Sequence, residues 1–295
     1  MIERDYLIKA IDRDKQVRVT IAHTTNLVQE AHCRHGTSAT ASAALGRVLT
    51  AALILGSDLK NQQDVLTLRV NGDGIAGPII ATVDSSGNGR ALISNPQADL
   101  PSPYPGKLAV GELVGKNGFL EVIRDVGLKQ PFVGRVKLVS GEIAEDLANY
   151  FLLSEQVPSL VSLGVLVNTD LSILAAGGLI VQAMPGAQDI VLERLENNIL
   201  SMNTISNLMA DSASVEEILA VIMDDINYNI VANRSLAFRC TCNRDRLAAI
   251  LANLTRAELE ETVAQTGKLE ISCNFCGEMY QYSLNEIDHI KQQKP

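Results

Sequence analysis

The sequence of 295 residues contains no tryptophan, and aromatic residues make up only 4% of it. Apolar residues still amount to 46% of the chain, so its hydrophobic core must be built mainly from aliphatic side chains. Charged residues contribute 20%. This is the composition of an ordinary globular protein, and it excludes a mainly disordered, collagen-like or coiled-coil chain. The length is sufficient for about two domains.

The chain also lacks an excess of positive charge, because 25 Lys and Arg residues stand against 34 Asp and Glu residues, a net charge of −9. Proteins that mainly bind nucleic acid usually present a basic face. The charged start of the chain has no apolar segment typical of a signal peptide. The most apolar stretch, residues 171–184, is interrupted by Ser172 and Gln182. It is shorter than the roughly 20 residues that span a bilayer. We therefore expect a soluble cytoplasmic protein with no nucleic-acid or membrane partner.

Strand and helix patterns alternate over residues 1–186, which predicts an α+β core domain with a mostly antiparallel sheet. Two segments have helical character, residues 37–55, which end at Gly56, and residues 142–153, which end before Pro158. A turn at residues 84–89 predicts a hairpin between two of the strands. The expected strands are residues 17–21, 65–70, 79–83, 91–94, 119–123, 133–139, 160–167 and 173–181.

The character of the sequence changes after Met184-Pro185-Gly186. Residues 187–230 have helical periodicity, with breaks expected at Asp211, Ser212 and Ser214, and form a predicted helical linker. Residues 231–295 form a predicted C-terminal unit with equal numbers of acidic and basic residues. The sequence thus predicts a core domain, a linker and a small third unit, without an internal repeat.

Cysteine is concentrated in that third unit. Cys240 and Cys242 form a CxC pair, and Cys273 and Cys276 form a CxxC pair after 30 intervening residues. Without a signal peptide, metal or redox use is favoured over a static disulfide framework. Zinc prefers four thiolates in a tetrahedron, and two close pairs supply that geometry. The sequence therefore predicts one zinc ion per chain bound by these four cysteines.

The residues around the cysteines support this prediction. Gly277 follows Cys276, where a tight turn around a metal needs a glycine. Residues 268–272 and 279–282 read as a hairpin that carries the second pair at its tip. Thr255 and Glu258 form a capping-box pattern that opens a helix in the spacer. Four cysteine ligands leave no open position, which argues against a catalytic zinc and leaves a static structural site as the alternative to a functional one.

Two glycine-rich segments resemble nucleotide-binding motifs without their context. Residues 72–77 match GxGxxG, but Pro78 and a further strand pattern follow where the dinucleotide fingerprint needs a helix. Residues 111–116 are one residue short of a P-loop, and Asn117 replaces the Ser or Thr that would bind magnesium. We therefore expect neither a dinucleotide nor a nucleoside triphosphate as cofactor.

No other constellation predicts catalysis. Cys33 lies between His32 and His35, but neighbours on a helix point in different directions, and we interpret it as non-catalytic. Glu142, Glu145 and Asp146 are interpreted as a solvated helix face, and His23 and His289 have no evident partners. We expect no catalytic residue, and thus a protein that is not an enzyme.

The four cysteines and several distant segments together resemble the redox-regulated heat-shock protein 33 chaperones. The CxC and CxxC pairs near the end of a chain of this size are that family's zinc switch. The resemblance covers nearly the whole chain. Its other segments are Asn71-Gly72-Asp73-Gly74 with Gly77-Pro78, Tyr150-Phe151 to Ser154-Glu155-Gln156 with Pro158-Ser159, and Gly177-Gly178 to Gln182 with Met184-Pro185-Gly186-Ala187.

The resemblance implies an N-terminal α/β domain, a helical linker and a zinc domain that form an ATP-independent holdase. The reduced, zinc-bound form would be inactive. Oxidants would form two disulfides within the close pairs, Cys240–Cys242 and Cys273–Cys276. Zinc would leave, the C-terminal region would unfold, and the protein would dimerise and bind unfolding clients. The resemblance assigns no role to Cys33. The competing hypothesis is a zinc-ribbon-like module that binds protein or nucleic acid through a permanent metal site.

Overall fold

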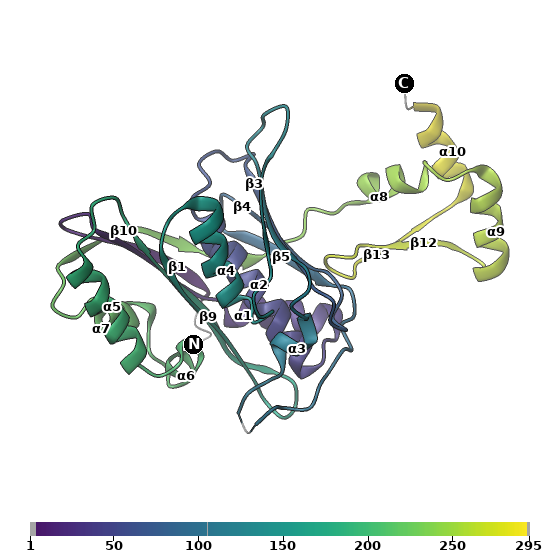
Figure 1. The fold of residues 1–295 in the computed structure, drawn as a ribbon. Coiled ribbons are helices and arrows are strands. Elements are labelled where there is room, and N and C mark those ends of the chain that lie inside the picture. Colours follow the sequence, from purple (N-terminus) through teal and green to yellow (C-terminus); the bar gives the residue numbers. More distant parts are fainter. Residues whose placement is uncertain (1–3, 105, 294–295) are drawn as a thin grey trace. The chain divides into compact units, whose positions relative to one another are not determined.

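The computed structural model describes residues 4–104 and 106–293 and divides the chain into two compact units, Met1–Arg239 and Cys240–Pro295 (Figure 1). The predicted α+β class is confirmed. The compact C-terminal unit begins after Arg239 rather than at residue 231, because strand β10 (Tyr228–Ser235) adds to a sheet of the N-terminal unit.

The first sheet of the N-terminal unit has five antiparallel strands in the order β10-β1-β2-β9-β8. The pattern-based predictions for β2, β8 and β9 are confirmed, whereas β1 and β10 were not predicted. β1 has no clean alternation because both of its faces are buried. The remaining strands are β1 (Tyr6–Asp12), β2 (Val17–His23), β8 (Ser159–Val167) and β9 (Ile173–Ala183).

The second sheet has six strands in the order β11-β5-β4-β3-β6-β7, antiparallel except for the β11–β5 pair. The predicted hairpin is present, because β4 and β5 pair across the 84–89 turn. Strand β4 directly follows the GxGxxG segment, so the helix of a dinucleotide site is absent there. The strands are β3 (Val65–Asn71), β4 (Ile79–Asp84), β5 (Asn88–Ile93), β6 (Phe119–Asp125), β7 (Phe132–Lys137) and β11 (Ala237–Phe238).

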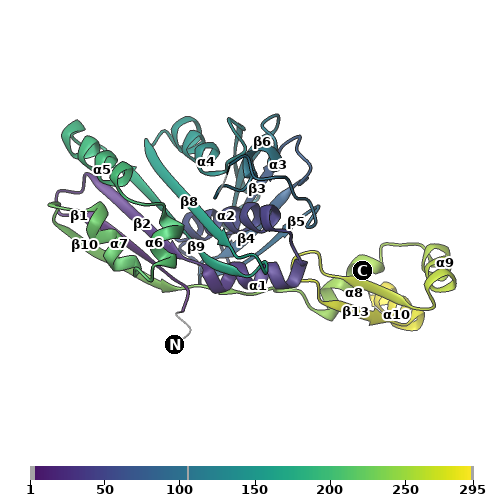
Figure 2. The same ribbon diagram turned by 90° about the horizontal axis from the view of Figure 1, so that it is seen from below.

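Helix α2 (Ala39–Gly56) lies between the two sheets and packs against β3, β4 and β5 on one side and β8 and β9 on the other (Figure 2). Ser38 caps it by accepting a hydrogen bond from the backbone N–H of Ala41. It is the one helix of the described residues that is long and apolar enough to cross a membrane, and nearly all of it is buried in the protein. Its sequence is therefore that of a core helix.

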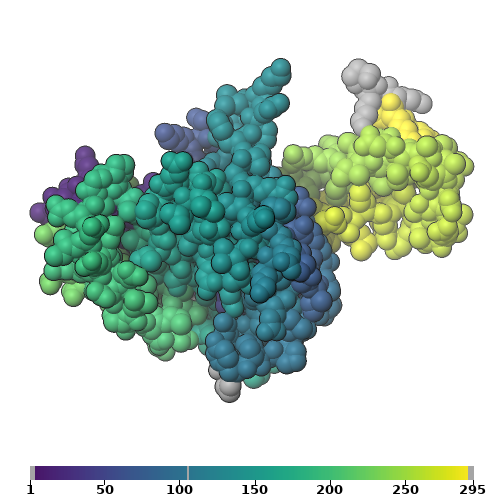
Figure 3. Space-filling model, in the orientation of Figure 1, coloured from purple at the N-terminus to yellow at the C-terminus, as the bar shows by residue number. Residues whose placement is uncertain are grey.

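Three shorter helices cover the opposite face of the first sheet: α5 (Asp189–Ser201), α6 (Ile205–Ala210) and α7 (Val215–Ile222) (Figures 1 and 2). The breaks predicted near Asp211 and Ser214 are confirmed. The helical prediction misses a further break at residues 202–204, between α5 and α6, and it fails at its end, where β10 begins at Tyr228. We call α5, α6 and α7 the cover helices; they form one side of the N-terminal unit in the space-filling view (Figure 3).

The cover helices and the sheet share a hydrophobic cluster separate from the core around α2. The sheet contributes one face of β1, β2 and β9, and the helices contribute their apolar faces. Its buried members are Ile8, Ala10, Val17, Val19, Ile21, Ala175, Leu179, Val181, Leu195, Ile205, Met209, Val215, Ile218, Leu219, Ile222 and Met223. This apolar sheet face would be open to solvent without the cover helices.

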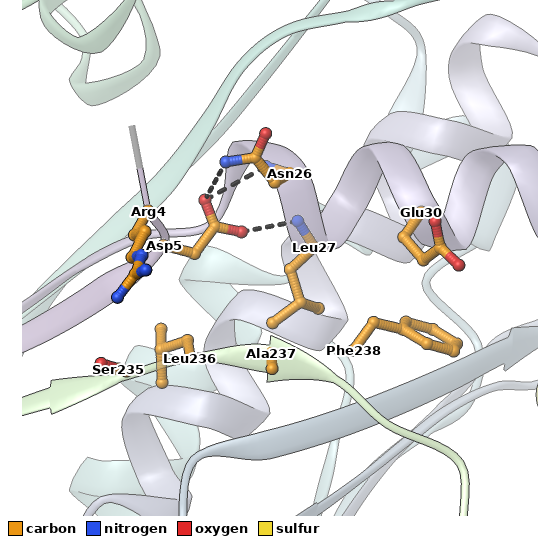
Figure 4. Close-up of a pocket in the computed structure, with 9 residues that line it drawn as sticks. All are labelled: Arg4, Asp5, Asn26, Leu27, Glu30, Ser235, Leu236, Ala237 and Phe238. Atoms are coloured by element: carbon orange, nitrogen blue, oxygen red, sulfur yellow. Dashed lines mark hydrogen bonds between the residues drawn. The ribbon is translucent and has the colours of Figure 1, made fainter. Parts of the chain in front are cut away.

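The segment between β10 and the first cysteine is tied to the N-terminal unit. The backbone N–H of Leu236 donates to the carbonyl of Asp5 (2.9 Å), and that of Arg239 donates to the carbonyl of Gly89 (2.9 Å). Ser235–Phe238 line a cavity of about 410 Å³ with the start of α1 (Thr25–His35) (Figure 4). The Asp5 carboxylate there accepts from the backbone N–H of Leu27 (2.6 Å) and so caps α1. The N-terminal unit therefore extends as far as Arg239.

Glu142, Glu145 and Asp146 were expected to lie on a solvated helix face. This prediction is wrong for two of the three. Asp146, at the start of α4 (Ala144–Tyr150), is fully buried, and Glu142 is half-buried against Arg47 (2.7 Å) and Lys107 (3.1 Å). Only Glu145 is exposed. Helix α4 continues as a π-helix, Phe151–Glu155, within the expected helical segment.

We expect Asp146→Ala to destabilise the N-terminal unit by about 3 kcal/mol. Its carboxylate accepts hydrogen bonds from the backbone N–H groups of Val139 (2.6 Å), Ser140 (3.1 Å) and Ile143 (3.0 Å), and the substitution removes this acceptor from all three, including the buried N–H of Ile143. Denaturant unfolding measures the change. The matched control, Glu145→Ala, should stay within about 0.5 kcal/mol of the unsubstituted protein. Equal stability of the two variants would contradict this assignment.

Candidate metal centre

As far as residue 293, the C-terminal unit consists of three helices and one hairpin. The predicted hairpin is confirmed, and Gly277 has a left-handed φ of 72° in its loop. The predicted capping box is also confirmed, because Glu258 N–H donates to Thr255 Oγ1 (3.3 Å) and Thr255 N–H donates to Glu258 Oε2 (2.6 Å). The elements are α8 (Arg244–Leu251), α9 (Arg256–Thr266), β12 (Leu269–Ser272), β13 (Met279–Tyr282) and α10 (Leu284–Gln293).

This fold brings all four C-terminal cysteines together. The sulfur atoms of Cys240, Cys242, Cys273 and Cys276 lie within 4.8 Å of one another. The Sγ–Sγ distance is 3.7 Å between Cys240 and Cys273 and 3.4 Å between Cys242 and Cys276. A zinc ion with four Zn–S bonds of about 2.3 Å would separate its sulfurs by roughly 3.8 Å. The four residues therefore fit a tetrahedral metal ion.

The second pair is held by its own backbone. The N–H groups of Cys276 (3.2 Å) and Gly277 (2.8 Å) donate to the carbonyl of Cys273, and Cys273 N–H donates to the carbonyl of Glu278 (2.9 Å). Both sulfurs of this pair are buried. The loop thus fixes two ligands before any metal binds.

Burial makes these thiols reluctant to ionise. Desolvation raises the pKa of Cys273 and of Cys276, although backbone N–H groups of Phe275 and Glu278 act in the opposite direction. Metal ions bind thiolates rather than thiols. Four clustered thiolates repel one another, so a cation is the natural partner of this cluster. Its positive charge would offset both the repulsion between the thiolates and the free-energy cost of burying them.

Two tyrosines of β13 connect the hairpin to the segment of the first pair. Tyr282 donates from its hydroxyl to the backbone carbonyl of Arg244 (2.6 Å), and the Arg244 guanidinium lies 4.5 Å from the Tyr282 ring centre. Arg244 also pairs with Glu286 of α10 (2.7 Å). The hydroxyl of Tyr280 lies 3.5 Å from the sulfur of Cys242. The sequence analysis missed Tyr280, although β-alternation places it on the same face as Tyr282.

Comparison with known proteins agrees with this geometry. A family model described as Hsp33 protein matches residues 5–283. The chain belongs to the Hsp33 family. It is 45% identical to the 33 kDa chaperonin of Desulforamulus reducens over 97% of both chains. It is 42% identical to that of Bacillus cereus strain B4264, over 97% of this chain and 98% of the relative.

A solved Hsp33 structure is also similar. It is the 33 kDa chaperonin (heat shock protein 33 homolog) of Thermotoga maritima, with a TM-score of 0.91, 34% sequence identity and coverage of 98% of each chain. The predicted resemblance is therefore confirmed, and membership of the Hsp33 family supports a chaperone rather than an enzyme.

The fifth cysteine of this Hsp33 chain lies in the N-terminal unit. Cys33 is exposed on α1, where Gln29 Nε2 donates to its sulfur (3.1 Å). The neighbouring histidines have other partners: His32 Nδ1 lies 3.1 Å from Thr37 Oγ1, and His35 Nε2 lies 2.9 Å from the carbonyl of Ala91. Neither of these two contacts is with the Cys33 sulfur, and its non-catalytic role stays a prediction.

The interpretation of His23 as a residue without a partner is wrong. Its Nδ1 lies 3.2 Å from the buried carboxylate of Asp5, and its Nε2 lies 3.3 Å from Thr25 Oγ1. Asp5 also caps α1, so His23 belongs to the polar contacts that join β1, β2 and α1. His289 lies exposed on α10.

Proposed function

We propose that this Hsp33 chain is a cytoplasmic, redox-regulated, ATP-independent holdase. Its reduced form binds one zinc ion through Cys240, Cys242, Cys273 and Cys276 and is inactive. The observation that carries this proposal is the cluster of four sulfurs within 4.8 Å of one another. Four sulfur ligands complete the tetrahedron, so the metal would stabilise the fold and would not activate water. This is consistent with a protein that is not an enzyme.

Oxidation would act on the cluster itself. A thiolate attacks the peroxide, forms a sulfenic acid and releases hydroxide, and a second thiolate then displaces a further hydroxide to form the disulfide. Two peroxide molecules thus convert four thiolates into two disulfides and release the zinc. The distances between the sulfurs do not decide which cysteines form disulfides. The short Sγ–Sγ distances, Cys240–Cys273 and Cys242–Cys276, each join one cysteine of the CxC pair to one of the CxxC pair. After metal loss, short loops favour Cys240–Cys242 and Cys273–Cys276.

The proposed client surface is the apolar sheet face beneath the cover helices. In the reduced protein α5, α6 and α7 bury it, together with their own apolar sides. Large exposed apolar patches bind partners, and the buried methionines Met209 and Met223 adapt to varied surfaces. Release of the cover would expose both sides to unfolding proteins and to a second copy of the chain.

The cover helices have the features of a region that opens easily. They are short, with 13, 6 and 8 residues, and they carry exposed Ile190, Leu200 and Val221 on their outer side. Of the three, α5 has a single buried residue, Leu195, and elements with few buried contacts open at low free energy. In this proposal the chain works as a core of residues 1–186, a linker of residues 187–230 and a C-terminal switch from residue 231, whose compact part begins at Cys240.

The alternative is a permanent zinc module that binds protein or nucleic acid. Charge weighs against a nucleic-acid partner, because residues 187–230 contain eight acidic residues and one basic residue. The two hypotheses differ in the response to oxidant. A permanent structural site keeps its zinc in mild peroxide, whereas the proposed switch releases it.

An aggregation assay of a thermally unfolding client, without ATP, tests the proposed function. We expect oxidised protein to suppress client aggregation and reduced, zinc-loaded protein to have little effect, because only the oxidised form exposes the sheet face. Peptide mapping of the same oxidised sample should find mainly the Cys240–Cys242 and Cys273–Cys276 disulfides. Cys33→Ser should behave as the unsubstituted protein does. Equal activity of the two redox forms would rule out the redox-gated proposal.

A further inference from the structure

The hydroxyl of Tyr280 is directed at one of the four sulfurs. Tyr280 is half-buried on β13, and its oxygen lies 3.5 Å from Cys242 Sγ, within the range of a hydrogen bond to sulfur. β13 also presents Tyr282, whose hydroxyl donates to a backbone carbonyl (2.6 Å) and not to a sulfur. The hydroxyls of two tyrosines on one strand face thus contact different groups.

The polar contact of Cys242 differs in kind from those of the second pair. Cys273 and Cys276 interact with backbone N–H groups, of Phe275 and Glu278. Those donors are part of the loop and persist in any variant that keeps its fold. Tyr280 contacts Cys242 through its side chain, so one substitution can remove the contact. Cys242 is also partly exposed, unlike the buried second pair, and is therefore more open to oxidant.

We propose that Tyr280 is a positioning residue that donates a hydrogen bond to the Cys242 thiolate, strengthens metal retention and slows oxidation at this sulfur. This inference rests on the proposed zinc centre. A hydrogen bond from a phenol O–H withdraws electron density from the thiolate and orients it toward the metal. The thiolate uses this electron density when it attacks peroxide, which forms a sulfenic acid and releases hydroxide. The hydrogen bond therefore opposes the first step of oxidation.

The test compares Tyr280→Phe with Tyr282→Phe in the full-length reduced protein. Both substitutions remove one hydroxyl from the same strand, but only the first removes a donor to sulfur. Outer hydrogen bonds to metal ligands typically change metal affinity by about 10- to 100-fold. We expect Tyr280→Phe to weaken zinc affinity by at least about tenfold in chelator competition, and to release zinc several-fold faster in dilute peroxide. Tyr282→Phe should change both measurements several-fold less than Tyr280→Phe, because the hydrogen bond it loses, to the carbonyl of Arg244, acts on the stability of the unit and not on a sulfur.

A spectroscopic measurement distinguishes a direct effect of the substitution on a sulfur ligand from a general loss of stability of the C-terminal unit. In the cobalt-substituted protein, the sulfur-to-cobalt charge-transfer band should shift in Tyr280→Phe and not in Tyr282→Phe. Unchanged affinity, release rate and band position in Tyr280→Phe would overturn the role of Tyr280. So would equal changes in the two variants, because those would reflect stability alone. If the unsubstituted reduced protein binds no zinc, the proposed function itself fails, and zinc analysis of that protein distinguishes this outcome.

Discussion

Removal of zinc from the reduced protein by a strong chelator should unfold residues 240–295 and leave the N-terminal unit folded. Structural zinc contributes about 10–16 kcal/mol to small finger-like units. Whole domains are stable by only about 5–15 kcal/mol. The C-terminal unit has a small core of its own, so the metal accounts for most of its stability. The buried apolar residues of this unit are Leu247, Ala248, Leu251, Leu259, Leu269, Cys273, Cys276, Tyr282 and Ile287.

Limited proteolysis with and without chelator measures this effect. Cleavage sites in residues 240–293 should become accessible, while the sheets of the N-terminal unit stay resistant. Cys273→Ser should reproduce the chelated state without chelator, because it removes a buried ligand. Cys33→Ser is the control, since Cys33 lies exposed on α1, and it should retain full protection. A C-terminal unit that stays resistant after complete metal removal would contradict a stabilising role for zinc.

Leu219→Asp should activate client binding in the reduced protein, without oxidant. Leu219 of α7 is fully buried against the apolar sheet face. An unpaired carboxylate there costs about 3–5 kcal/mol, as for an uncompensated buried charge. That is comparable to the stability expected of a short helical segment that opens locally. The cover helices should therefore detach and expose the sheet face.

The matched control is Val221→Asp on the same helix. Val221 is 51% exposed, so its replacement adds the same charge at the surface without burying it. Binding of an apolar fluorescent dye and suppression of client aggregation should both rise in Leu219→Asp and stay at the reduced level in Val221→Asp. A Leu219→Asp protein with a detached cover, seen by hydrogen exchange, and no holdase activity would exclude the sheet face as the client surface.

Much of this fold could be predicted because its strands alternate. β3, β4 and β5 have strictly alternating burial, so their sequence pattern identifies them. β10 is an exposed edge strand that contains two asparagines, and its pattern carries no such signal. It is defined by pairing with β1, which is more than 200 residues earlier in the sequence. Long-range pairing of this kind is not visible in local periodicity.

The metal centre could be predicted because its signal also lies within a few residues of sequence. The CxC and CxxC spacings place each pair of ligands within a few residues, and Gly277 marks the turn between them and β13. Contacts that depend on tertiary structure were missed. Asp146 receives its donors from a preceding loop, His23 contacts Asp5, which lies just before β1, and Tyr280 contacts Cys242 across the unit. Each is a polar residue whose role depends on a partner far away in sequence or in another element.

Hydrogen exchange of the reduced, zinc-loaded protein and the peroxide-oxidised protein tests the central claim most directly. The account predicts that oxidation abolishes protection in residues 240–293 and in the cover helices α5, α6 and α7. Protection of β3, β4 and α2 should remain, because these elements have their own core. Unchanged protection of α5, α6 and α7 after zinc release and formation of both disulfides would contradict the coupling of the cysteine centre to the apolar sheet face.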